Sequence, residues 1–166
     1  MILRAAWLYS PFGHNFIETM LRLAESRSDV GIVNDQIGNP TYAPHLAAGI
    51  LTIAYRIRES SSSPGGLWGT YHAAGSGEAT WYRLAREVFN QSERLGGPVT
   101  QVHPITTAEY PTPACRPTDS RLDCSKCASV FGVRLPGWTI GVAECVSRLV
   151  MQTTERGLAT RTVGAP

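Results

Sequence analysis

The polar stretch Asn34–Thr41 has the residue types of a ligand-binding loop. It reads NDQIGNPT and lies between an apolar segment and an apolar helical pattern. Its side chains are short hydrogen-bond donors and acceptors, Gly38 lets backbone approach a ligand closely, and Pro40 stiffens the exit. The alternative is that the stretch caps the next helix, although a cap needs fewer polar residues. From the residues alone, both interpretations stay open.

A second candidate is Arg116, which lies in the proline-rich segment Glu109–Pro117 (EYPTPACRP). A guanidinium on a stiff loop is a preorganised fork for a diphosphate. The alternative is a surface ion pair with Glu109 or Asp119. Two weaker candidates lie nearby in the sequence: Tyr110 and Ser120.

Trp7, near the end of the first predicted strand, is a third candidate. An indole can stack on a sugar or base face and donate one hydrogen bond. Without further information, packing in the core is the commoner role of an aromatic residue at a strand end.

Other reactive residue types form no catalytic or metal-binding motif. Cys124 and Cys127 make a single CxxC without a second ligand pair, so we interpret the four cysteines as reduced thiols. The histidines show no HExxH spacing, and His72 is expected to be a buried residue with its hydrogen bonds satisfied. The lone GxG at Gly75–Gly77 predicts a turn and is weak support for nucleotide binding.

Composition indicates a globular protein that can form one core. The 166 residues are 43% hydrophobic and 17% charged, with a net charge of +2. The sequence has no basic block, so nucleic acid and membrane surfaces are poor candidates as partners. No apolar run reaches the roughly 18 residues that span a bilayer, and the first residues lack the pattern of a signal peptide. We expect a cytoplasmic location.

Strand and helix patterns alternate, which predicts an α/β fold with a partly parallel sheet. The expected strands are Ile2–Tyr9 (buried), Val30–Val33, a short strand at Tyr71 and His72, and Val99–Ile105. Five helices are expected. The first follows Asn15, and the second starts at Pro44 with one face formed by Leu46, Ile50, Ile53 and Ile57. The third starts at Trp81 and has Leu84, Ala85 and Val88 on one face, and the last two cover Leu122–Phe131 and Thr139–Val150. Residues 60–66 read as a flexible loop and residues 151–166 as a flexible tail.

Several ordered blocks together carry a family resemblance. They are WLYSPFGHNF from Trp7, DQIGNPTYA from Asp35, GTYH from Gly69, TWY from Thr80, YPTPACRP from Tyr110 and SRLD from Ser120. The combination resembles the dTDP-4-dehydrorhamnose reductases, a family of extended short-chain dehydrogenases/reductases. The resemblance covers the chain up to about residue 150 and implies the carboxy-terminal half of a protein roughly twice as long.

The resemblance implies reduction of dTDP-4-dehydro-L-rhamnose to dTDP-L-rhamnose with NADPH or NADH. The Gly-rich cofactor turn and the catalytic Tyr-x-x-x-Lys would belong to the other half. None of the six tyrosines has a lysine four positions later, and Lys126 is the sole lysine. We therefore predict no catalytic residue here, a cofactor bound mainly by the other half, and a fragment that is inactive alone.

The resemblance also implies how the chain is divided and which residues bind substrate. Residues of about 1–13 and 41–75 would complete the cofactor-binding sheet, and about 14–40 and 78–150 would form the substrate-binding subdomain. The predicted substrate contacts, for a sugar nucleotide, are Trp7, Gln36, Asn39, Tyr110, Arg116 and Ser120. An exposed sheet edge implies a partner, either a chain that carries the other half or a second copy.

Two further expectations follow from the same comparison. Some members bind Mg²⁺ through a carboxylate in the first turn of the second helix, but Pro44 and His45 occupy that turn here, so we do not expect the metal. The alternative function is that of a non-catalytic regulatory protein, similar to the superfamily members that serve as a methionine adenosyltransferase subunit.

Overall fold

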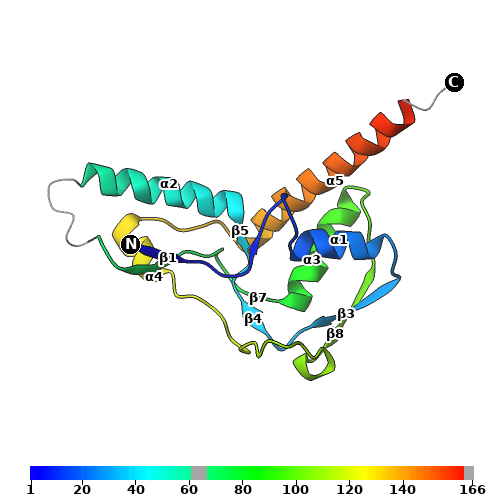
Figure 1. Ribbon diagram of the computed structural model, residues 1–166, viewed down its shortest axis with the longest axis horizontal. Helices are drawn as coiled ribbons and strands as arrows, with labels where there is room; N and C mark the ends of the chain where they lie inside the picture. The colour runs from blue at the N-terminus through cyan, green and yellow to red at the C-terminus, as the bar shows by residue number, and fades with distance from the viewer. Residues whose placement is uncertain (61–66, 163–166) are drawn as a thin grey trace.

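The computed structural model describes the backbone of residues 1–60 and 67–162 and the side chains of this part up to residue 152. The predicted loop at 60–66 therefore lies almost wholly outside the described residues. Figure 1 shows two lobes that meet near strand β5 (Thr41–Tyr42). We call the first the sheet lobe, formed by β1 (Ile2–Arg4), β6 (Thr70–His72), α2 (Ala43–Glu59) and α4 (Ser125–Phe131). The second, the α/β lobe, is formed by α1 (Phe16–Ala24), α3 (Trp81–Arg94), β3 (Asp29–Val33) and β8 (Gln101–Ile105).

The sheet lobe contains a parallel strand pair with a crossover helix. Strand β1 (Ile2–Arg4) pairs in parallel with β6 (Thr70–His72), with Ile2 opposite Thr70. Helices α2 (Ala43–Glu59) and α4 (Ser125–Phe131) pack on this pair through a small core that includes Ile53, Tyr71 and Phe131. Gly132, with φ of 56°, ends α4 in the left-handed conformation, as its sequence predicts.

The α/β lobe is built on a second parallel pair, β3 (Asp29–Val33) with β8 (Gln101–Ile105). Helix α3 (Trp81–Arg94) packs on this pair, and helices α1 (Phe16–Ala24) and α5 (Trp138–Thr162) pack against α3. Short strands join the two lobes, namely β2 (Leu8–Tyr9) with β5 (Thr41–Tyr42) in parallel and β4 (Ile37–Gly38) with β7 (Ala79–Thr80) antiparallel. A 3₁₀ helix, η2, covers Thr107–Glu109. The predicted α/β class with parallel strands is confirmed.

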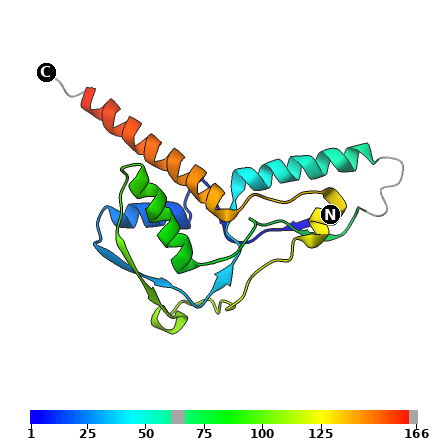
Figure 2. The ribbon, with the colours of Figure 1, turned by 180° about the vertical axis from the view of Figure 1, so that it is seen from behind.

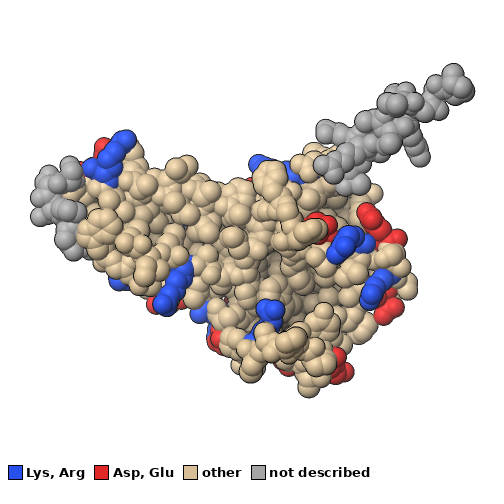
Figure 3. Space-filling view, viewed as in Figure 1, with Lys and Arg blue, Asp and Glu red and all other residues tan. Residues whose placement is uncertain are grey.

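Basic and acidic residues nearly balance, with a net charge of +2. Basic and acidic side chains are interspersed on the face in Figure 3, and neither sign forms a continuous patch there. No helix in the described part of the chain is long and apolar enough to cross a membrane.

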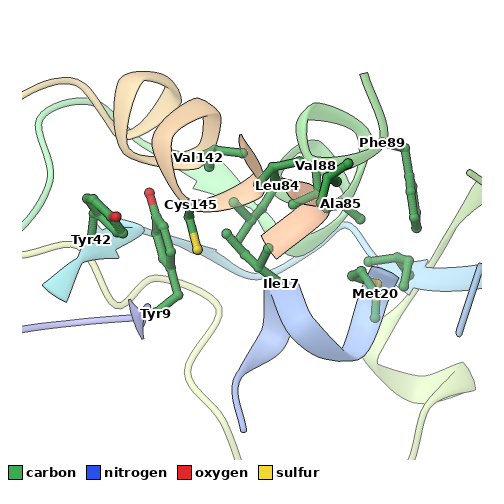
Figure 4. Close-up of a cluster of buried hydrophobic side chains, with 13 residues drawn as sticks. Tyr9, Ile17, Met20, Tyr42, Leu84, Ala85, Val88, Phe89, Val142 and Cys145 are labelled. Carbon is green, nitrogen blue, oxygen red and sulfur yellow. The ribbon is translucent and has the colours of Figure 1, made fainter. Parts of the chain in front are cut away.

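The larger core lies between α1, α3 and α5, and Figure 4 shows its side chains meeting across these helices. The predicted stripe on α3 is confirmed, because Leu84, Ala85 and Val88 are buried. Val142 and Val146 of α5 are also buried. Helical periodicity in the sequence therefore identified the residues of this core.

Three predicted elements are corrected. Ile2–Tyr9 is not one buried strand, because Trp7 has φ of 45° and separates β1 from β2, and Ile2 is 58% exposed. Ile50 of α2 is also exposed, since Gly49 and Ile53 face the core instead. The last helix does not end near Val150 but continues to Thr162.

Asn15 caps α1 as its sequence predicts. Its Oδ1 accepts hydrogen bonds from the backbone N–H of Ile17 and Glu18, and its Nδ2 donates to the carbonyl of Ser10 at 2.8 Å. We expect Asn15→Ala to lower the free energy of unfolding by about 1 to 2 kcal/mol, measured by urea denaturation. The control is Asn90→Ala in exposed α3 surface, where the higher helix propensity of alanine makes loss of stability unexpected. Equal effects of the two substitutions would contradict the capping role.

Candidate functional site

A cavity of about 530 Å³ lies in the α/β lobe between α1, β3 and the loop that follows η2. Its walls combine apolar side chains with a few polar and cationic groups. The lining residues that matter below are Phe16, Arg27, Gln36, Trp81, Tyr110 and Arg116. Few polar groups on apolar walls are typical of small-molecule sites, because the apolar surface lowers the competition from water.

The chain direction gives the cavity two ends. Helix α1 and strand β3 follow one another and both line it, so Arg27 and Val30 lie at the end where the chain turns. Phe16 and Gln36 lie at the other end, where both contact Trp81. The ring centroids of Phe16 and Trp81 are 4.9 Å apart.

Gln36 is buried and held at both ends of its amide. Its Oε1 accepts a hydrogen bond from Trp81 Nε1 at 3.2 Å, and its Nε2 donates to Thr107 Oγ1 at 3.0 Å. Asp35 in turn accepts hydrogen bonds from the backbone N–H and hydroxyl of Thr107, which lowers the pKa of this carboxyl. The polar wall at this end of the cavity is therefore fixed before any ligand binds.

Arg116 lines the same cavity and forms no ion pair with any residue that the structure describes. The alternative partners considered from the sequence are engaged elsewhere. Glu109 accepts hydrogen bonds from Thr106, and Asp119 is bound by Arg121. The guanidinium of Arg116 is therefore available to an anionic ligand, with Tyr110 beside it in the cavity wall.

Trp7 and Ser120 bind each other and are not among the residues that line this cavity. Trp7 Nε1 donates a hydrogen bond to Ser120 Oγ at 3.1 Å. The Trp7 ring stacks on Trp81, with centroids 3.6 Å apart and planes 7° apart. Trp7 thus contacts a residue of the cavity wall while remaining partly exposed, and its contact with a ligand stays a prediction.

Asn39 connects segments that are distant in the sequence. Its Nδ2 donates to the carbonyl of Gly77 at 2.7 Å, and its Oδ1 accepts from the N–H of Leu122 at 2.7 Å. Arg121 lies in the same hollow, between Asp119 and Glu78. Its hydrogen bonds lower the pKa of Asp119 to about 2. The structure gives the Asn39 amide a bridging role away from Gln36, and ligand binding by Asn39 stays a prediction.

Sequence reasoning did not single out Trp81 or Arg27. Trp81 was expected only as part of a helical stripe, although it follows the N-cap Thr80 directly. No local pattern predicts that its indole reaches Gln36 and Trp7, which are 45 and more positions away. Arg27 follows α1 and lacks any local motif.

The remaining reactive groups form no described metal or thiol site. No group of three or more His, Cys, Asp or Glu side chains lies together within the described residues. His45, in the first turn of α2, lies 3.2 Å from Glu144 of α5. Burial raises the pKa of the Cys124 and Cys127 thiols, which keeps them protonated, so neither is an activated nucleophile.

The fold and the cavity together define a class of protein. A parallel strand pair with a crossover helix, beside a second lobe of mixed α/β structure, is the C-terminal part of a Rossmann-type extended short-chain dehydrogenase/reductase. The model of the RmlD substrate binding domain matches residues 1–151. The chain belongs to the dTDP-4-dehydrorhamnose reductase family, whose members are oxidoreductases.

Individual relatives agree with this assignment. The dTDP-4-dehydrorhamnose reductase of Sinorhizobium fredii is 44% identical over 151 residues, which are 91% of this chain and 50% of the relative. The Escherichia coli K12 enzyme of the same name is 39% identical over 92% of this chain and 50% of its own length. The chain therefore spans about half the length of the curated relatives it matches.

Solved structures of the same family are similar to this fold. The reductase from Clostridium acetobutylicum has a TM-score of 0.74 at 33% identity and covers 89% of this chain and 48% of its own. The reductase from Bacillus anthracis, solved in complex with NADP, has a TM-score of 0.71 at 31% identity and covers 86% and 46%. The predicted family and the predicted carboxy-terminal half are confirmed.

Proposed function

We propose that this chain is the substrate-binding half of a dTDP-4-dehydrorhamnose reductase. In this function the α/β lobe binds dTDP-4-dehydro-L-rhamnose, which is then reduced to dTDP-L-rhamnose. The observation that carries the proposal is the cavity in which the unpaired guanidinium of Arg116 faces a space bounded by apolar walls and the fixed amide of Gln36. A guanidinium suits a diphosphate, and the amide suits sugar hydroxyls.

The chemical step needs groups that this chain does not contain. A bound NADPH or NADH supplies the hydride, and a Tyr-x-x-x-Lys pair would supply the proton, but the chain has neither that motif nor a Gly-rich dinucleotide turn. The residues of this chain bind and orient the sugar nucleotide. The cofactor is bound mainly by polypeptide that corresponds to the other half of the relatives, and Mg²⁺ has no part in the proposal.

The sheet lobe supports the need for a partner. Among the described residues, β1 pairs only with β6, and Ile2 at its start is 58% exposed. The outer face of α2 presents Leu51 and Tyr55, which are 71% and 52% exposed. Figures 1 and 2 show, from both sides, that α2 and α5 diverge from the region of β5. We propose that a chain carrying the cofactor-binding half covers this surface, rather than a second copy of this chain.

Binding of dTDP tests the proposed function. We expect the chain to bind dTDP in isothermal titration calorimetry, and Arg116→Ala to weaken the affinity by about 10- to 100-fold, because a charge-assisted hydrogen bond contributes about 1.5 to 3 kcal/mol. Arg116→Lys should recover only part of the loss, since lysine lacks the bidentate fork.

The matched control is Arg134→Ala, which removes an exposed arginine outside the cavity and should leave the affinity unchanged. Equal affinity in Arg116→Ala and the unsubstituted chain would contradict the proposal. That result would favour the alternative of a non-catalytic regulatory protein, which has no need of a diphosphate site.

A further inference from the structure

Trp81 connects the cavity to Trp7. It begins α3, lines the cavity, and donates the hydrogen bond of its indole N–H to Gln36 Oε1. One face of its indole stacks on Trp7 at a centroid distance of 3.6 Å. Its N-cap, Thr80, is itself fixed by a hydrogen bond to Asn34 Oδ1 at 2.7 Å. Trp81 is therefore held at its backbone, at its ring nitrogen and on one ring face.

Trp7 is held in an unfavourable backbone conformation. Its φ of 45° is the only positive value at a non-glycine residue among those described. Bulky residues adopt this conformation only when their surroundings impose it. Its ring contacts the Trp81 ring, the Ser120 hydroxyl and the backbone at Gly38, and its carbonyl accepts a hydrogen bond from the N–H of Thr41 at 3.0 Å.

Gly38 shows how closely Trp7 is enclosed. A Cβ atom at Gly38 would lie 2.4 Å from Cε2 and 2.6 Å from Nε1 of Trp7. No real Cβ contact is so short, so the Trp7 ring occupies its place only because residue 38 lacks a side chain. Ser120 Oγ also donates to the carbonyl of Ile37 at 3.1 Å, which ties the partner of the Trp7 indole N–H to the same strand.

We propose that Trp81 is a positioning residue that sets the orientation of Trp7 relative to a ligand in the cavity. The inference rests on the proposed function, in which Arg116 binds the diphosphate, and adds the predicted contact between the deoxysugar and Trp7, which is half-buried. Trp81 then acts on the sugar through Trp7, while the diphosphate contact does not depend on the stack. A purely structural wall residue would affect every ligand of the cavity equally.

The first test compares dTDP-L-rhamnose with dTDP by calorimetry on the whole chain. The quantity measured is the ratio of the two affinities, which reports the sugar contact alone. We expect Trp81→Leu to lower this ratio at least about fivefold, and Trp81→Phe to retain most of it, because phenylalanine can still stack. Trp7→Ala should lower the ratio as well, and Trp81→Leu added to Trp7→Ala should cause no further loss. An unchanged ratio in Trp81→Leu, or additive losses in the double variant, would overturn the proposal.

The second test needs no ligand and so separates this inference from the proposed function. With Trp68→Phe and Trp138→Phe as background, either Trp81→Phe or Trp81→Leu leaves Trp7 as the single tryptophan of the chain. We expect acrylamide to quench Trp7 fluorescence at least about twice as strongly in Trp81→Leu as in Trp81→Phe. Equal quenching would show that Trp81 does not hold Trp7. If the chain bound neither dTDP nor dTDP-L-rhamnose, the proposed function would be wrong. The difference in quenching between Trp81→Leu and Trp81→Phe would still show whether Trp81 holds Trp7.

Gly38→Ala provides a variant that leaves position 81 intact and serves if Trp81→Leu does not fold. The new Cβ would displace Trp7 from the stack, so the affinity ratio should fall as it does in Trp81→Leu. An unchanged ratio in Gly38→Ala would contradict the enclosure from which the proposal starts.

Discussion

Replacing Gly75 by alanine is expected to lower the free energy of unfolding by about 3 kcal/mol or more, a large part of the stability of a domain of this size. A Cβ atom at this position would lie 2.1 Å from the backbone oxygen of Pro40. The N–H of Gly75 donates to Thr41 Oγ1 at 3.1 Å, and Thr41 is fully buried in the junction between the lobes. Neither backbone can move without breaking this contact. Urea denaturation followed by circular dichroism measures the loss.

Gly137→Ala is a closely matched control. Gly137 forms an isolated bridge with Ser76, the residue after Gly75, so both glycines lie at the same junction. A Cβ at Gly137 would meet nothing within 4 Å, and its φ is not in the left-handed region. We expect its free energy of unfolding to fall by no more than about 1 kcal/mol, because Gly137 precedes α5 at the N-cap, where alanine is somewhat less favourable than glycine. If both substitutions lowered the free energy of unfolding by similar amounts, the close approach of the Pro40 oxygen would not explain the effect of Gly75→Ala.

Helices and their core positions could be predicted because the residue pattern that specifies them lies within one short stretch of the sequence. The 3.6-residue periodicity places Leu84 and Val88 on one face of α3 whatever the helix packs against, and Asn15 is a strong cap in almost any context. Ile50 shows where this reasoning fails. It has the right spacing to face inward, but the orientation of α2 is set by Gly49, at which a Cβ would lie 3.0 Å from a Leu135 methyl group.

The short strands could not be predicted because their partners are distant. β4 and β7 have two residues each and pair across about 40 positions of sequence, so neither has a periodic pattern of its own. The break of Ile2–Tyr9 at Trp7 is of the same kind. Its positive φ follows from tertiary contacts of the indole and leaves no trace in an apolar run of residues.

The residues of the candidate site also divide into those that could be predicted from the sequence and those that could not. Residue chemistry identified Gln36, Tyr110 and Arg116, and all three line one cavity. It could not show that the Asn39 amide bonds backbone groups 38 and 83 positions away. Amide side chains have the same hydrogen-bonding capacity toward a ligand and toward backbone, so only the fold decides which of them stays available.

The isolated chain is expected to show no oxidation of NADPH with dTDP-4-dehydro-L-rhamnose, and a polypeptide covering the first half of the Sinorhizobium fredii relative is expected to restore it. Alignment with half of that relative, an uncovered β1 edge and the missing Tyr-x-x-x-Lys motif all support this expectation. A positioned general acid contributes about 10²- to 10⁴-fold, and holding the reactants together contributes considerably more. Loss of both takes the rate below detection. Absorbance at the NADPH band measures turnover for each polypeptide alone and for the mixture.

Two variants test whether the restored activity depends on the cavity and on the outer face of α2. Arg116→Ala in this chain should lower the restored turnover at low substrate concentration, while Arg134→Ala should leave it unchanged, because only the first lines the cavity. Leu51→Asp on the outer face of α2 should weaken assembly of the two polypeptides, since it places a charge where apolar surface would be buried. Turnover by this chain alone would contradict the assignment of proton and hydride transfer to the other half. If Arg116→Ala left the restored turnover unchanged, the substrate would have to bind outside the cavity.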